Sequence, residues 1–154
     1  MMGPACEAYL SVDAAAINDG DYAGICALQG NYGLIAITKE EGKYYLVMLK
    51  KDENPEDGIW GPKGGDTRPG KEMARVPFDA SKATLKVKAN FVDGIDEAEF
   101  YYRQGDQWIK LGPGHKLQFR LDHFCGCRFG LFLFSTREIG GVADFEHFVY
   151  NVID

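Results

Sequence analysis

The chain consists almost entirely of short apolar segments, rich in β-branched and aromatic residues, that are separated by turn residues. We predict strands at residues 7–12, 22–29, 32–38, 43–50, 83–91, 98–103, 107–111 and 116–121, followed by two closing strands within residues 127–150. Residues 84–90 alternate strictly, as a strand with one solvent-facing side does. No long helical period occurs, although residues 11–18 have room for one helical turn. This pattern predicts an all-β fold, a two-sheet antiparallel β-sandwich or jelly roll.

Length and composition are those of one globular domain spanning residues 1–154. Hydrophobic residues make up 45% of the chain and aromatic residues 13%, which is enough apolar material for a two-layer core. The formal net charge is −6, and no basic cluster interrupts the acidic balance. We therefore expect neither nucleic acid nor an anionic membrane as a partner. No apolar run approaches the roughly 20 residues that span a bilayer.

The N-terminal segment and the cysteines give information about the cellular compartment of the protein. Residues 1–6 contain neither the charged nor the apolar region of a signal peptide. The four cysteines form no obvious disulfide framework, and Cys125 and Cys127 are separated by a single glycine. We expect these two cysteines to be reduced, which favours a cytoplasmic location.

A long loop at residues 51–70 interrupts the strand pattern. It contains three prolines, several glycines and many charged residues around Trp60. A loop of this length is often functional, and Trp60 is then a candidate ligand-binding residue. The alternative is a surface excursion in which Trp60 folds back as a plug.

The strand at residues 127–135 carries bulky apolar side chains on both of its faces. Alternation places Cys127, Phe129, Leu131 and Leu133 on one face and Arg128, Gly130, Phe132 and Phe134 on the other. A sandwich strand needs only one buried face, so we expect a loop, a neighbouring domain or a ligand to cover the second. Arg128 on that face is a candidate anchor for a sugar or a carboxylate, and an internal salt bridge is its alternative role.

Sugar recognition requires aromatic rings for the apolar face of the sugar and planar polar groups for its hydroxyls. Gln29 and Tyr32 flank a tight turn and are candidates for one rim of a concave face. Tyr101 is a further candidate. Trp108 is expected in the core.

Asp144 and Glu146 alternate onto one face of the last strand and are candidate ligands of a structural calcium ion. Their alternative role is that of solvated carboxylates. No motif requires a cofactor. Glycosidase chemistry needs two carboxylates that face each other across a sugar, and the sequence nominates no such pair. We therefore predict no catalytic residues.

Several fragments share their order and spacing with one known domain. They are residues 2–8, 20–29, 32–37, 98–102 and 107–112, and, most specifically, residues 123–132 and 140–148. Together they resemble the C-terminal concanavalin A-like accessory domain of glycoside hydrolase family 43 β-xylosidases and arabinofuranosidases. The resemblance covers most of the chain and includes none of the catalytic propeller.

The resemblance implies a concanavalin A-like jelly roll, classed as a carbohydrate-binding module with xylan or xylo-oligosaccharide as its ligand. In two-domain relatives this module packs on the five-bladed catalytic propeller, and a loop bearing a phenylalanine leans toward the active site. Phe124 stands at the position of that loop. Relatives usually have a second Asp where this chain has Glu146, which weakens a calcium role carried over to that position.

The resemblance also implies that relatives have opening strands ahead of Gly3. A sandwich without its first strands has an unpaired edge that recruits another chain, so we expect either a truncated chain or a homodimer across that edge. Two functions remain open. The first is a non-catalytic carbohydrate-binding module of a xylan-degrading glycosidase. The second is a structural domain that completes or stabilises a family 43 propeller without binding sugar. The chain is not expected to be an enzyme on its own.

Overall fold

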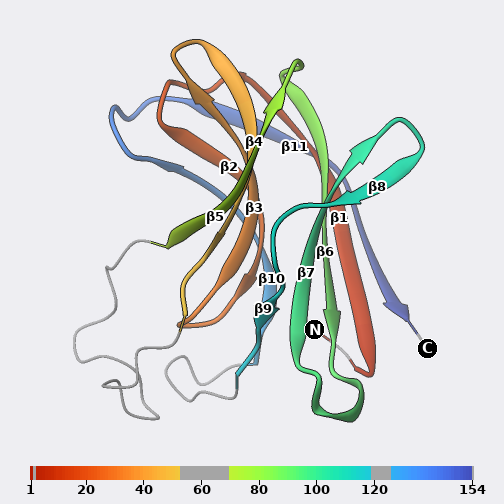
Figure 1. Cartoon of the computed structure of the whole chain (residues 1–154). Coiled ribbons are helices and arrows are strands. Elements are labelled where there is room, and N and C mark those ends of the chain that lie inside the picture. Colours follow the sequence, from red (N-terminus) through yellow and green to blue (C-terminus); the bar gives the residue numbers. More distant parts are fainter. Residues whose placement is uncertain (2, 53–69, 119–125, 154) are drawn as a thin grey trace.

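The computed structural model describes residues 1, 3–52, 70–118 and 126–153, which form two antiparallel sheets packed face to face (Figure 1). Sheet A contains, in order, β11 (Val142–Ile153), β1 (Ala5–Ala16), β6 (Lys82–Asn90), β7 (Glu97–Gln104) and β8 (Gln107–Lys110), and β9 (His115–Lys116) pairs with β7. Sheet B contains, in order, β10 (Arg128–Ser135), β2 (Asp21–Leu28), β3 (Gly33–Glu40), β4 (Lys43–Lys50) and β5 (Lys71–Phe78). The predicted all-β sandwich is confirmed.

A 3₁₀ turn, η1 (Val92–Gly94), joins β6 to β7. Within the described part of the chain, no helix is long and apolar enough to cross a membrane.

The strands follow the predicted segments with three differences. The strand predicted at residues 116–121 is wrong in its extent, because β9 ends at Lys116, residues 117 and 118 are not in a strand, and residues 119–121 lie outside the described part of the chain. The helical turn expected within residues 11–18 is wrong, because β1 stays extended to Ala16 and pairs there with Val142 of β11. The sequence analysis also misses β5, whose charged residues and Pro77 do not resemble a central strand. Such a composition suits an edge strand. Proline has no N–H to donate, and on the solvent side of an edge strand there is no neighbouring strand that needs one.

The core lies between the sheets and is built from alternate residues of the central strands. Leu10 and Leu85 of sheet A belong to one buried cluster with Ile25 and Ile35 of sheet B, and all four are fully buried. Phe100 of β7 joins the same cluster. Burial of each such side chain contributes about 1.5–3 kcal/mol, so contact between the sheets is the main stabilising interaction.

The central strands of sheet B are apolar on their outer face as well. Their outward positions hold a second buried cluster, made of Cys26, Leu34, Ala36 and Val47. Phe132 of β10 packs against this cluster. The apolar character expected on both faces of residues 127–135 therefore continues across the sheet.

Sheet A has a polar outer face, as the alternation in residues 84–90 predicts. The expected core position of Trp108 is wrong, because this residue pairs with Arg103 in register and shares its outward direction. The Trp108 ring lies 4.4 Å from Lys86 Nζ and 5.5 Å, centroid to centroid, from the Tyr9 ring. Ile109, the next residue, takes the inward position of β8.

Gly24 provides a test of how closely β2 and β3 approach. A Cβ atom at this position would overlap the backbone oxygen of Ile35, and backbone cannot move aside as a flexible side chain can. We predict that Gly24→Ala lowers the free energy of unfolding by about 2 kcal/mol or more. Gly126→Ala is the matched control, because no atom of the described residues lies within 4 Å of its Cβ position. Equal midpoints of urea unfolding for the two variants would contradict this account.

His115 makes folding stability depend on pH. It is buried, and neither ring nitrogen makes a hydrogen bond of normal geometry with a described residue. Burial lowers its pKa, although the Asn31 backbone opposes part of the shift. The unfolded chain protonates this histidine near its ordinary pKa of about 6.5, whereas the folded chain does so only at lower pH. Stability should therefore fall as the pH drops from about 7 to 5.

The variant His115→Gln isolates this effect, since glutamine does not titrate. Carboxylates with lowered pKa, such as Glu99, lose their stabilising charge only below about pH 4.5 and so act outside this window. Urea unfolding across the window should show a flatter pH dependence for the variant than for the original chain. An unchanged slope would rule out His115 as its source.

Candidate functional site

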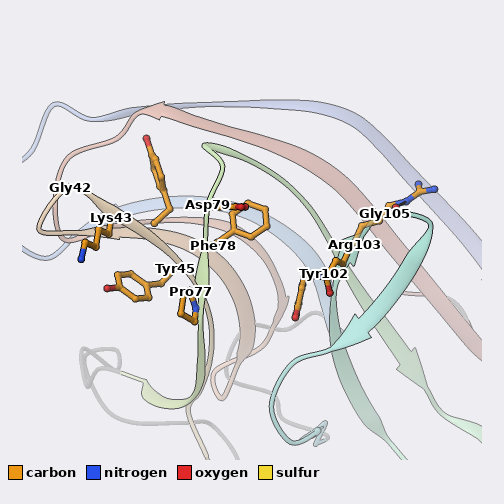
Figure 2. A pocket seen from close by; sticks show the side chains of 11 residues that line it. Gly42, Lys43, Tyr45, Pro77, Phe78, Asp79, Tyr102, Arg103 and Gly105 are labelled. Carbon is orange, nitrogen blue, oxygen red and sulfur yellow. Dashed lines mark hydrogen bonds between the residues drawn. The ribbon is translucent and has the colours of Figure 1, made fainter.

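A cleft of about 910 Å³ opens along one side of the sandwich (Figure 2). It lies between the β4–β5 edge of sheet B and the β7–β8 hairpin of sheet A. Its lining includes Tyr44, Tyr45 and Phe78 from sheet B and Tyr102, Arg103 and Gln104 from sheet A. The two sheets thus contribute opposite walls.

Aromatic rings line the cleft because core-facing positions near the sheet edges are only half covered. Tyr44 and Phe78 are cross-strand neighbours on β4 and β5, and Tyr102 approaches from β7. All three pack against the edge of the core. The Tyr44 hydroxyl donates a hydrogen bond to the Ala14 carbonyl oxygen at 3.1 Å, which holds that ring in place.

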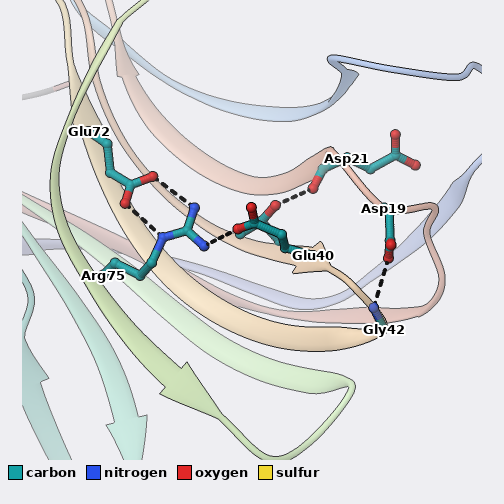
Figure 3. A network of polar contacts seen from close by, with 7 residues as sticks. Asp19, Asp21, Glu40, Gly42, Glu72 and Arg75 are labelled. Atoms are coloured by element: carbon teal, nitrogen blue, oxygen red, sulfur yellow. Dashed lines mark hydrogen bonds and ion pairs between the residues drawn. The ribbon is translucent and has the colours of Figure 1, made fainter.

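Beside the cleft, Arg75 ties three strands of sheet B together (Figure 3). Its guanidinium donates hydrogen bonds of 2.7 and 3.0 Å to the Glu72 carboxylate and one of 2.7 Å to Glu40. It also lies 4.8 Å from the centroid of the Tyr45 ring. These hydrogen bonds occupy the guanidinium donors. We therefore expect Arg75 to hold the Tyr45 ring in position and not to bind a ligand itself.

The other side of the sandwich is bordered by β10 and β11, the edge strands of the two sheets. They approach each other at one end, where the rings of Phe129 and Tyr150 meet edge to face with 6.0 Å between centroids. Core-facing side chains of both strands remain exposed. We call five of them the seam: Leu131, Leu133, Phe148, Tyr150 and Val152, which are 37% to 53% exposed.

The register shows that the seam residues point toward the core. Leu131 pairs with Ile25 of β2, and Tyr150 pairs with Ala8 of β1. Both partners are fully buried, so exposure begins only at the outermost strands. Exposed apolar side chains on two facing edge strands make the seam a candidate contact surface.

Arg128 lies on the outer face of β10, opposite Leu28, with an exposed side chain. The internal salt bridge considered for Arg128 is not formed with any described residue. The face assignment of this strand is confirmed, since Leu131 points toward the core while Phe134 points outward and stacks on Tyr22 at 5.0 Å.

Gln29 lines a smaller pocket of about 460 Å³ together with Leu117 and Cys127. Its side-chain amide donates to the Gln118 carbonyl oxygen at 2.7 Å and accepts from the Gln118 amide at 3.2 Å. Gln29 therefore secures a backbone segment. Tyr32 lies three residues further along the chain, half-buried, with Lys51 Nζ 5.9 Å from its ring centroid.

Tyr101 projects from the outer face of sheet A, away from the other candidates. Its hydroxyl donates to Glu99 Oε2 at 2.7 Å, and burial together with this carboxylate raises the pKa of Tyr101 to about 12. Trp60 and Phe124 lie outside the described residues. The structure thus places Arg128, Gln29 and Tyr101 on different surfaces rather than in one site.

Asp144 and Glu146 share the outer face of β11, opposite Asp13 and Ser11 of β1. Glu146 is paired with Lys82 at 2.5 Å, and this hydrogen bond lowers the pKa of its carboxyl. A cation at this position would have to displace the lysine. The described residues contain no group of three or more His, Cys, Asp or Glu that could hold a metal ion. The calcium site stays a prediction.

Cys127 is a free and buried thiol, as expected from the sequence. Burial raises its pKa to about 12, so it is protonated at neutral pH. Cys125 lies outside the described residues.

The residues that line the cleft were not nominated by the sequence analysis. Phe78 was missed because β5 was not recognised, and Tyr102 lies in a predicted strand without being named as a candidate. One signal was present in the Tyr101-Tyr102 pair, since strand alternation sends two adjacent rings to opposite faces. Nothing local indicates which of them lines a cleft with rings from the other sheet.

Comparison with known proteins agrees with this architecture. Residues 1–151 match the family described as the β-xylosidase C-terminal concanavalin A-like domain. A solved bifunctional GH43-CE protein from Bacteroides eggerthii is similar at 31% identity and a TM-score of 0.82, with 97% of this chain and 18% of that chain covered. No curated protein matches the sequence.

Two further solved structures share the fold. An engineered GH43 glycoside hydrolase with endo-xylanase and exo-arabinofuranosidase activity has 24% identity and a TM-score of 0.84, over 98% of this chain and 30% of that one. A xylan β-1,4-xylosidase from Bacillus halodurans C-125 has 18% identity and a TM-score of 0.70, over 97% and 28%. The chain therefore spans 18% to 30% of the length of these solved proteins.

The family match covers all but the last few residues, and the described strands form the sandwich that the family's description requires. That description places the domain at the C-terminal end of β-xylosidases, outside the catalytic propeller. The expectation that the chain is not by itself the catalytic part is confirmed. The chain belongs to the family of β-xylosidase C-terminal concanavalin A-like domains.

Proposed function

We propose that this chain is a non-catalytic accessory domain of a xylan-degrading family 43 glycosidase, and that it packs through the seam against the rest of such an enzyme. The observation that carries the proposal is the exposure of core-facing residues such as Leu131 and Phe148 on two edge strands. Protein surfaces that stay in water seldom leave several large apolar side chains of two edge strands exposed together.

The length of the relatives supports the proposal that the rest of an enzyme covers the seam. The solved relatives are longer chains of which this domain occupies 18% to 30%, and their names refer to GH43 enzymes. Each half-exposed seam residue would gain about 1 kcal/mol on completing its burial. Five such residues form an apolar centre adequate for a domain interface.

The backbone of both edge strands adds to this argument. Within the described residues, β10 pairs only with β2, and β11 only with β1. Each strand therefore offers an unpaired row of N–H and C=O groups beside the exposed side chains. A polypeptide in extended conformation would satisfy the hydrogen bonds and cover the apolar residues together.

A domain exchange with the Bacteroides eggerthii relative tests the proposal. This chain would replace the matched domain of that protein, with and without the double variant Leu131→Ser, Phe148→Ser. We expect the double variant to lower the melting temperature of the exchanged enzyme much more than that of the isolated chain, because both residues are already half-exposed in isolation. Calorimetry of the four proteins gives the comparison.

Leu28→Ser is the matched control, since Leu28 is 47% exposed like Leu131 but lies on the outer face of sheet B. Leu28→Ser should lower the melting temperature by the same amount in the isolated chain and in the exchanged enzyme. If the seam double variant also lowers both melting temperatures equally, the seam does not face the enzyme. If instead light scattering shows a dimer of the isolated chain that the seam variant dissociates, a second copy is the occupant.

A further inference from the structure

The edge strands of the two sheets differ in how well they are protected against pairing with a further strand. On one side of the sandwich, β5 contains Pro77 and three charged residues, and β8 and β9 are only four and two residues long. On the other side, β11 is long, but its register with β1 shifts at two places, and His147 within it has a positive φ of 55°. Proline, charge, short length and bulges are the features that keep natural sheet edges from pairing.

β10 has none of these protections. Its eight residues pair with β2 without a register shift. It contains no proline, and Arg128 at its first position is its one charged residue. Within the described part of the chain, β10 is bonded to β2 alone, so one row of its backbone N–H and C=O groups is unpaired. An edge of this kind is open to the addition of an extended segment.

Exposed apolar side chains occur on both faces of β10. Leu131 and Leu133 point toward the core and are 47% and 37% exposed, while Phe134 on the outer face is 38% exposed. β11 differs, because its outer face carries Asp144 and Glu146. A domain that packs against the side of the sandwich reaches the inward side chains, whereas an added strand continues both faces of the sheet. The second arrangement covers Phe134 as well.

Arg128 gives the added strand a charge preference. Its side chain is exposed on the outer face of β10 and forms no ion pair with a described residue. A carboxylate at the neighbouring position of an added strand would form a cross-strand pair with it. The rest of β10 is apolar apart from Ser135 at its end, so we expect the remaining positions of the added strand to be uncharged.

We propose that β10 accepts an extended segment of the enzyme, which becomes a sixth strand beside the five described strands of sheet B. This inference rests on the proposed packing through the seam and adds its mode, because it assigns backbone pairing to one of the two edge strands. The segment matches the eight residues of β10, presents apolar side chains on both faces and places an acidic residue beside Arg128. β11 contributes side-chain contacts only.

Leu133 and Phe134 are a matched pair of residues for the test, since they are adjacent and similarly exposed but lie on opposite faces of β10. In the enzyme exchanged with the Bacteroides eggerthii relative, Leu133→Ser and Phe134→Ser should each lower the melting temperature by at least about 2 °C more than in the isolated chain. The stacking of Phe134 on Tyr22 is lost in both contexts and so cancels in this comparison. Ile139→Ser, at a 92% exposed position after β10, is the control and should show no such difference.

Amide hydrogen exchange tests the pairing of the backbone itself. In an edge strand only alternate amides are bonded to the neighbouring strand, so the number of slowly exchanging amides in residues 128–135 should about double in the exchanged enzyme. Mass spectrometry of peptide fragments gives this number for both proteins. The amides of β5 are the control and should exchange as they do in the isolated chain.

An extra loss for Leu133→Ser but none for Phe134→Ser, with unchanged exchange in β10, would overturn strand addition and leave packing through the seam supported. No extra loss for either variant or for the seam double variant would overturn both proposals. New protection in β11 instead of β10 would place the strand on the other sheet and refute the assignment. Arg128→Ser should also destabilise the exchanged enzyme more than the isolated chain, and an equal effect would refute the acidic residue of the added strand.

Discussion

Face-to-face packing of the two sheets is the interaction on which the rest of the structure depends. The inward residues of the central strands, such as Leu10 and Ile25, lose all contact with water, and no disulfide is formed by Cys6, Cys26 or Cys127. The same packing weakens toward the edges of the sheets, where an inward side chain lacks a neighbour on one side. Both candidate functional surfaces arise at these edges.

The two sides of the sandwich have different chemistry. At the seam, the inward residues of β10 and β11 are mostly aliphatic or phenylalanine, and their exposure to water is unfavourable. At the cleft, the inward residues are mostly tyrosine, beside charged and amide side chains. Tyrosine tolerates partial exposure because its hydroxyl is hydrated while its ring remains in contact with apolar groups. One side thus suits a protein surface, and the other a polar ligand with an apolar face.

The outer faces of the sheets separate these roles further. Sheet A presents charged residues and the Trp108–Lys86 contact, and sheet B presents a second apolar cluster behind the Arg75 network. Arg75 of β5 is held by Glu72 of the same strand and Glu40 of β3, and it lies over the Tyr45 ring of β4 beside the cleft. The cleft wall on this side is therefore fixed by charge-assisted hydrogen bonds as well as by packing.

Alternation predicted side-chain direction well wherever a strand was long and regular. It assigned the faces of residues 127–135 and the wet side of residues 84–90 correctly. It failed for Trp108. In a four-residue strand after a tight turn, pairing with β7 decides which face each side chain occupies. The helical turn expected at residues 11–18 is absent for a different reason, since pairing with β11 keeps β1 extended despite a run of alanines that would suit a helix.

The sequence by itself determined the two-sheet β-sandwich, most strand positions and the family, because these follow from local alternation, turn residues and motif order. Only the tertiary structure decided that β10 and β11 are edge strands, which leaves Leu131 and Phe148 exposed although they point inward. It also decided that Tyr102 lines the same cleft as Phe78 while Tyr101 does not. The physical reason is that alternation is a property of one strand, whereas exposure depends on which strands lie beside it and opposite it.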